Sequence, residues 1–134
     1  MSGETDLARL LAGMRPERQP GIYVFVTLRD GAVPAGFTPV MSFREAEGTT
    51  LILPEDEAAR AGLAGTFPCG WITLAVHSSL SAVGFLAAVT ARLAAAGLAV
   101  NAVSAFHHDH LFVPAARVEE AMVLLRDLAG PSTP

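Results

Sequence analysis

The first half of the chain combines one helical pattern of apolar residues with several short extended runs. Apolar residues recur at helical spacing over residues 5–14, which predicts a short helix that ends before Pro16 and Pro20. Three runs typical of strands follow, over residues 21–29, 40–43 and 49–53. A second helix is predicted from Pro54 to about Ala61, because proline suits a helix start and the acidic residues after it favour the positive end of the helix dipole.

The second half begins with a strand and a longer helix. Residues 71–78 alternate between two faces, which predicts a strand with one face buried more deeply. The helix after it is expected to be capped by Ser79 or Ser81 and to end at Gly97. Its predicted inner stripe consists of Val83, Leu86, Val89, Thr90 and Leu93.

Two more strands and a last helix complete the pattern. Residues 98–106 and 111–113 read as strands joined by a histidine-rich tip, and Pro114 opens a helix whose inner stripe is Val118, Met122 and Leu125. The order is therefore β-α-β-β-α in the second half and α-β-β-β-α in the first. We expect an α+β fold with two similar small sheets, each with helices on one side.

One long region is almost free of charge. Between Arg60 and Asp109 the only charged side chain, histidines apart, is Arg92, which indicates burial in a core or an interface. Residues 82–100 are nearly long enough to span a membrane, but Arg92 near their middle would cost about 2.5–3.5 kcal/mol there. We therefore expect no membrane span.

The composition excludes other classes of protein. With 134 residues, 51% apolar and 16% charged, the chain is long enough for one well-filled core. The net charge is −4 and the nine basic residues are scattered arginines, so we expect no nucleic-acid partner. A lone cysteine, Cys69, and an N-terminus without the features of a secretory signal predict a cytoplasmic location.

The run "HHDH", residues 107–110, is the most distinctive local motif. In an extended strand His108 and His110 would share a face, and with Asp109 they resemble part of a three-ligand metal site. A further ligand would have to come from elsewhere, and the only other histidine is His77. We favour a polar hairpin tip, in which Asp109 and His110 can still face a ligand, and expect no bound metal.

Nucleophilic catalysis is the second chemistry to consider. Cys69 with a histidine as base, or Ser78 and Ser79 beside His77, would each need an orienting group and an oxyanion site. The surrounding residues lack the glycine pattern of a nucleophile elbow. We therefore interpret these residues as a buried cysteine and helix-capping serines, and expect neither an enzyme nor a cofactor.

The segment "HSSLSAVGFLAAV", residues 77–89, turns a strand directly into a helix. Backbone N–H groups at a helix start point into such a turn and can hold a carboxylate. Gly84 lets either a ligand or a neighbouring backbone come close, or merely relieves crowding against the sheet. Spacing alone does not choose between these interpretations.

Residues 77–114 resemble the ACT domain, a small-molecule-binding regulatory module of amino-acid metabolism, in the form found in aspartokinases. The match lies in the glycine-bearing turn into a helix and in "GLAVN" at the start of the next strand. The runs "YVFVTL" from Tyr23 and "HDHLFVP" further resemble small stand-alone bacterial proteins of two ACT-like modules. The resemblance implies two tandem ferredoxin-like (βαββαβ) modules packed side by side, over residues 1–69 and 70–134.

The resemblance also implies a function and a site. It predicts a non-catalytic module that binds an amino acid or a similar metabolite at an interface between modules or subunits, and we expect a homodimer. The alternatives are a histidine- or metal-dependent enzyme and a ligand-free dimerisation module. The implied ligand-binding residues are Ser78, Ser79, Leu80, Val83, Gly84, Phe85, Val100, Asn101 and Val103, to which we add Asp109 and His110 from the hairpin.

Overall fold

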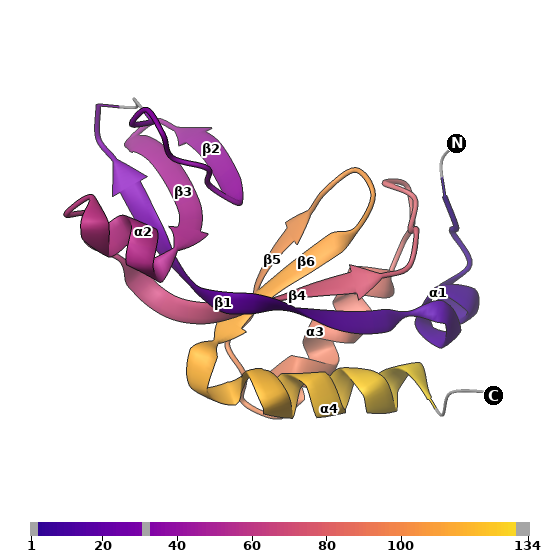
Figure 1. Cartoon of the computed structure of the whole chain (residues 1–134). Coiled ribbons are helices and arrows are strands. Elements are labelled where there is room, and N and C mark those ends of the chain that lie inside the picture. Colours follow the sequence, from indigo (N-terminus) through magenta and orange to yellow (C-terminus); the bar gives the residue numbers. More distant parts are fainter. Residues whose placement is uncertain (1–2, 31–32, 131–134) are drawn as a thin grey trace. The chain divides into compact units, whose positions relative to one another are not determined.

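The computed structural model describes residues 3–30 and 33–130 and divides the chain into two compact units (Figure 1). Unit 1 contains residues 1–20 and 70–134, and unit 2 contains residues 21–69. The elements are α1 (Leu7–Gly13), β1 (Arg15–Leu28), β2 (Met41–Glu45), β3 (Gly48–Pro54), α2 (Glu55–Arg60), β4 (Thr66–Ala75), α3 (Phe85–Ala95), β5 (Asn101–Ser104), β6 (Asp109–Pro114), a 3₁₀ turn (Ala115–Arg117) and α4 (Val118–Ala129). The element order predicted for both halves is confirmed.

Unit 1 is a sheet with helices on one side. Its strands follow the order β4-β6-β5, and Figure 1 shows α3 and α4 along one side of them. The apolar core between these layers includes Ile72 and Leu74 of β4, Leu111 and Val113 of β6, Val89 and Leu93 of α3, and Val118 and Leu125 of α4. Leu10 of α1 and Met14, its C-cap residue, add to this core, so the first 20 residues contribute to the unit formed by the second half.

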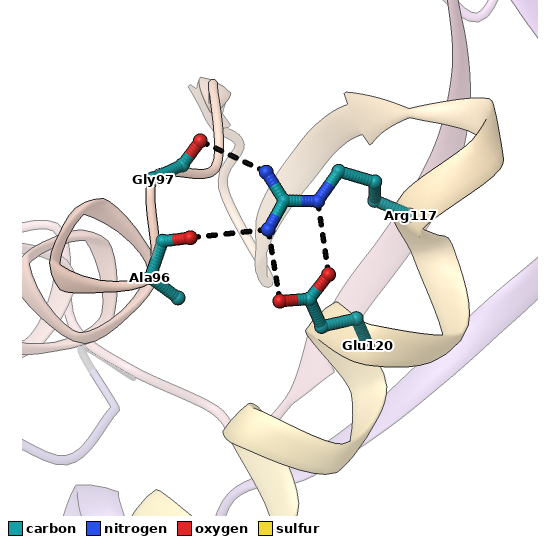
Figure 2. Close-up of polar contacts among 4 residues, drawn as sticks. All are labelled: Ala96, Gly97, Arg117 and Glu120. Atoms are coloured by element: carbon teal, nitrogen blue, oxygen red, sulfur yellow. Dashed lines mark hydrogen bonds and ion pairs between the residues drawn. The ribbon is translucent and has the colours of Figure 1, made fainter.

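Arg117 fixes the C-terminal end of α3 to the start of α4 (Figure 2). Its guanidinium donates to the carbonyl oxygens of Gly97 (2.9 Å) and Ala96 (3.0 Å), which have no partner within the helix. Glu120 accepts two hydrogen bonds from the same guanidinium, at 2.9 and 2.8 Å. These hydrogen bonds raise the pKa of Arg117 and lower the pKa of Glu120. The C-terminal end of α3 is thereby tied to the start of α4.

Unit 2 is a smaller antiparallel sheet with one short helix. β1 pairs with β3 from Tyr23 opposite Pro54 to Leu28 opposite Thr49, and β2 pairs with β3. The core consists of Val24, Val26, Leu28, Leu51, Leu53 and Ala58. Ala58 is the only buried residue of α2, so this helix adds little apolar area to the unit.

Two strands begin earlier than the apolar pattern predicts. β1 starts at Arg15 and runs through Pro16 and Pro20, and β4 starts at Thr66 and includes Pro68. The prediction that Pro16 and Pro20 precede the first strand is therefore wrong. Proline holds φ at about −65°, which extended backbone tolerates, so it ends a helix more strictly than a strand. The two predicted modules, residues 1–69 and 70–134, describe a fold repeated along the chain, and they are not the same as the two compact units. The boundary between the modules stays a prediction.

The prediction that a serine caps α3 is wrong. The helix begins at Phe85, and its N-cap is Gly84 in the left-handed conformation, with φ +92°. Ser79 instead closes a local turn, because its Oγ accepts from the Ser81 N–H and its carbonyl from the Ala82 N–H. Val83 therefore precedes the helix and is 84% exposed, so its predicted place on the inner stripe is also wrong.

The histidine-rich motif is divided between a tip and a strand. The tip is closed by the Ala105 N–H, which donates to the carbonyl of His108 at 2.9 Å. Asp109 and His110 already belong to β6, paired with Ser104 and Val103 of β5. The prediction that the whole motif forms the tip is therefore correct only for its first half. Within the described ranges, no helix is long and apolar enough to cross a membrane.

Candidate functional site

A small pocket lies in unit 1 where the β4–α3 turn meets the β5–β6 hairpin. Its volume is about 90 Å³. Its lining residues are Ser78, Ser79, Leu80, Ala82, Phe85, Leu86, Ser104, Ala105 and Asp109. Three of these side chains are polar and almost fully buried: Ser78 (9% exposed), Ser79 (7%) and Asp109 (8%).

The β5–β6 hairpin places Asp109 beside the turn. Asp109 pairs with Ser104, and both residues line the pocket. Among the described residues the hydrogen-bond partner of the Asp109 carboxylate is Ser78, whose Oγ donates to Oδ2 at 3.5 Å. That distance exceeds the usual range of about 2.5–3.0 Å for such a bond. A buried carboxylate is costly unless a donor or a cation compensates it, so Asp109 is suited to receive a charged donor from a ligand.

The start of α3 supplies the opposite polarity. Part of the preceding backbone is already occupied, because the Ser81 N–H donates to Ser79 Oγ and the Ala82 N–H to the Ser79 carbonyl. The first N–H groups of a helix have no partner within it, and the helix dipole makes this end positive. Phe85 and Leu86 are the first two residues of α3 and line the pocket. The pocket thus has an anionic side at Asp109 and a positive side at the helix start.

The sequence predicted about half of this lining. Ser78, Ser79, Leu80, Phe85 and Asp109 line the pocket, whereas Val83, Gly84, Val100, Asn101, Val103 and His110 do not. Val100 packs against the core of unit 1, and Asn101 is exposed. The lining also includes four residues that the sequence did not predict: Ala82, Leu86, Ser104 and Ala105. Ser104 and Ala105 become neighbours of Asp109 through the hairpin register, which the apolar pattern did not fix.

His110 belongs to a separate polar cluster. Trp71 donates from Nε1 to His110 Nδ1 at 3.0 Å, Thr73 Oγ1 lies 3.1 Å from the same nitrogen, and Gln19 Nε2 donates to Thr73 Oγ1 at 3.0 Å. Since the indole can only donate, Nδ1 accepts and the imidazole is neutral. Burial lowers the pKa of His110, nearby His108 lowers it further, and Asp109 opposes the shift. Successive residues of a strand face opposite sides, so Asp109 and His110 serve different environments.

The described part of the chain holds no group of three or more histidine, cysteine, aspartate or glutamate residues suited to a metal ion. The histidines do lie near one another: the ring centroids are 6.0 Å apart for His77 and His107, and 6.3 Å apart for His108 and His110. His107 is exposed, and Asp109 is directed to the pocket instead. The motif is therefore a chain of ring contacts rather than a ligand set.

The candidate nucleophiles occupy environments that do not activate them. Cys69 is fully buried, its thiol donates to the carbonyl of Tyr23, and burial raises its pKa to about 11. A reactive cysteine requires the opposite shift, because the thiolate is the nucleophile. The hydroxyls of Ser78 and Ser79 contact Asp109 and the Ser81 N–H rather than the exposed imidazole of His77.

This arrangement defines a ferredoxin-like α+β module with a small polar pocket at its strand-to-helix turn. Comparison with known protein families identifies the particular family: ACT domain models match residues 2–70 and 66–127. The chain belongs to the ACT domain family and contains two such domains in tandem, as the resemblance implied. ACT domains are typically regulatory modules that bind small ligands.

Solved structures agree with this assignment. A Vibrio cholerae protein of unknown function, described as a possible transport protein, shares 39% identity over 92% of this chain and 95% of its own, with a TM-score of 0.84. An Agrobacterium tumefaciens protein shares 21% identity over 87% of this chain and 89% of its own, with a TM-score of 0.74. The ligand-free regulatory subunit of aspartate kinase from Thermus thermophilus shares the fold, with 10% identity, a TM-score of 0.65 and coverage of 84% and 95%. No curated protein matches the chain.

Proposed function

We propose that this protein is a non-catalytic regulatory module that binds a small amino acid in the pocket at the start of α3. The observation that carries the proposal is the buried carboxylate of Asp109, which faces a pocket whose other side is a helix start. The cytoplasmic location stays a prediction.

The two sides of the pocket complement the two charged groups of an α-amino acid. The α-ammonium would donate to Asp109 and to the hydroxyl of Ser78, which is 3.5 Å from that carboxylate. The α-carboxylate would accept from the free N–H groups at the start of α3, where anions are favoured. An isolated anion would be repelled by Asp109, and an isolated cation by the helix start. A zwitterion satisfies both sides.

The size and lining of the pocket limit the ligand further. Its volume of about 90 Å³ is small and suits the ammonium, the carboxylate and a short side chain. The lining contains no cationic side chain, so a second carboxylate on the ligand would have no ionic partner. Leu80, Ala82 and Ala105 offer apolar contacts to the rest of the ligand. A small neutral amino acid fits these constraints.

The same face supports self-association. Leu80 lines the pocket and is 67% exposed, Val83 is 84% exposed, and Phe106, which follows the lining residue Ala105, is 65% exposed. Exposed apolar groups at a ligand site are typical of a surface that a partner covers. We propose a homodimer in which the second copy covers this surface. Light scattering of the purified protein would check it, and a monomer at all concentrations would contradict it.

The melting temperature in the presence of each common amino acid, at millimolar concentration, tests the binding proposal. A ligand at 100 times its dissociation constant stabilises the fold by about 2.7 kcal/mol, which raises the melting temperature by several degrees in a domain of this size. We expect the small neutral amino acids to give the rise and the acidic ones to give none. If no amino acid raises the melting temperature, the ligand-free dimerisation module is the better description.

Asp109→Asn provides the matched test of the site. Loss of the charge removes an ionic hydrogen bond of about 1.5–3 kcal/mol, so the affinity falls by at least about tenfold. The variant without ligand should be at least as stable as the wild type, because a poorly compensated buried charge is gone. The control is Asp127→Asn on the exposed face of α4, which should behave as the wild type. Equal binding by both variants would exclude Asp109 as the ammonium partner.

A further inference from the structure

The N-terminal segment is hydrogen-bonded to the turn that forms the pocket. The Glu4 N–H donates to the carbonyl of His77, and the Ser79 N–H donates to the carbonyl of Glu4, both at 2.9 Å. Glu4 and Ser78 thus form an isolated parallel bridge. Ser78 and Ser79, both pocket residues, lie on the backbone that this bridge holds.

Gly3 is specifically suited to this contact. Its φ of +82° lies in the left-handed region that favours glycine. A Cβ atom on Gly3 would lie 2.9 Å from the carbonyl oxygen of His77 and 3.0 Å from the backbone nitrogen of Ser79. These neighbours are backbone atoms, which cannot move aside as a flexible side chain does. Any other residue at this position would push the segment away from the turn.

The same segment reaches the far end of the turn through α1. Leu7, the first residue of α1, lies at Gly84, where an added Cβ would be 3.6 Å from Leu7 Cδ2. Asp6 caps α1 by accepting from the Arg9 N–H at 3.0 Å, and Leu10 anchors the helix in the core. Residues 3–7, which we call the N-terminal clamp, therefore hold both ends of the turn from residue 77 to residue 84.

We propose that the N-terminal clamp positions the pocket and reports its occupancy, so that ligand affinity depends on the clamp and ligand binding stabilises it. This inference rests on the proposed function. If the clamp releases, the Ser79 N–H and the His77 carbonyl lose their partners, and the pocket backbone is free to relax. By linkage, a ligand that requires the ordered turn stabilises the clamp by the same factor by which the clamp strengthens binding. Occupancy of the pocket is thereby converted into order at the N-terminus.

The experiment compares two glycine variants, Gly3→Ala and Gly13→Ala. A Cβ on Gly13 would make an ordinary contact, 3.7 Å from Val76 Cγ2, so this variant is the matched control. The first measurement is amide hydrogen exchange at Glu4 and Ser79 by NMR, without ligand. We expect both amides to exchange at least about tenfold faster in Gly3→Ala, because the free energy of local opening is lower in this variant. In the control both amides should exchange at the wild-type rate.

The second measurement is the melting-temperature rise with the panel of common amino acids. We expect a smaller rise in Gly3→Ala than in the wild type and the control. In the wild type, the amino acid that gives the largest rise should slow exchange at Glu4, a residue outside the pocket lining. If Gly3→Ala fails to fold, Leu7→Ala, at a side chain already 38% exposed, tests the far end of the clamp by both measurements.

The outcomes separate the clamp from the proposed function. The inference is overturned if the Glu4 and Ser79 amides remain protected from exchange in Gly3→Ala. It is also overturned if these amides lose their protection but the melting-temperature rise with ligand is as large as in the wild type. If no amino acid shifts the melting temperature of the wild type, the proposed function fails and the clamp loses its regulatory role. The exchange data still show in that case whether residues 3–7 hold the turn.

Discussion

The β4–α3 turn of unit 1 and the β3–α2 turn of unit 2 differ in the space that they leave for a ligand. In unit 1, β4 ends at Ala75 and α3 begins at Phe85, so residues 76–84 form a loop that curls around the pocket. In unit 2, β3 ends at Pro54 and α2 begins at the next residue. A pocket at such a turn requires backbone between the strand and the helix, which the β4–α3 turn has and the β3–α2 turn lacks.

The charges of the two helix starts reinforce this difference. The first turn of α2 carries Glu55, Asp56 and Glu57, whereas the first turn of α3 has no acidic residue. Acidic side chains already complement the dipole of α2 and repel an incoming carboxylate. Unit 2 has a wider hollow of about 300 Å³ beside Glu57. The Glu57 carboxylate already has a partner there, because it accepts a hydrogen bond from the Thr38 N–H at 3.1 Å. Of these two turns, the one in unit 1 is therefore the better candidate for a binding site.

The largest contrast is expected in stability. Leu93 of α3 is fully buried, so Leu93→Ala should reduce the free energy of unfolding by about 2–5 kcal/mol. Ala58 is the only buried residue of α2, and Ala58→Gly should cost about 1 kcal/mol. Urea unfolding followed by circular dichroism measures both. Equal losses of unfolding free energy would mean that the two helices contribute equally to stability, which would contradict the difference in their burial.

An acidic residue introduced into the pocket should make the first turn resemble the second. Ala82→Asp places a carboxylate in the pocket lining, near the start of α3. It should lower the affinity for an amino acid by at least about tenfold through repulsion of the ligand carboxylate. Calorimetric titration measures the affinity, with Ala91→Asp on the exposed side of α3 as the control. Undiminished binding by Ala82→Asp would place the ligand elsewhere.

Acid should affect unit 1 selectively, because all four histidines of the sequence lie in it. The folded state keeps His110 neutral, with its pKa below the ordinary value of 6.5. As the pH falls, the unfolded chain therefore binds a proton at His110 before the folded chain does. The contribution of neutral His110 to the free energy of unfolding is complete above about pH 6.5 and is lost as the pH falls through the lowered pKa.

Protonation of Nδ1 also removes the acceptor of the Trp71 indole, and Trp71 is the only tryptophan. Its fluorescence should report a transition below pH 6.5 that is absent in His110→Phe. His108→Gln should move the midpoint upward, because nearby His108 lowers the pKa of His110, whereas the charge of the adjacent residue Asp109 raises it. A transition that persists in His110→Phe would assign it to another group.

The smallest effect is expected at the surface of α2. Arg60 and Asp56 form an ion pair at 3.4 Å, but their side chains are 70% and 78% exposed. Asp56→Asn should change the free energy of unfolding by no more than about 0.5 kcal/mol, because water and salt screen such a pair. Urea unfolding at low and high salt measures it. A loss above about 1 kcal/mol would indicate that α2 depends on its surface charges.

Local patterns predicted the elements well where one physical rule dominated. The stripe of Val118, Met122 and Leu125 is buried in α4, and α2 has its acidic first turn. The start of α3 was mispredicted, because a serine before a helical pattern is equally able to close a local turn. Gly84, which the pattern left open between three roles, is the N-cap.

By itself the sequence determined the order of the elements, their buried faces and the resemblance to the ACT family, because periodicity and turn residues act over a few neighbours. Only the tertiary structure decided the composition of the pocket. The β5–β6 register brings Asp109 to Ser78, and residues 3–7 reach the turn at residues 77–84 from the other end of the sequence. Such contacts join residues that are far apart in the chain, and no local rule relates their identities.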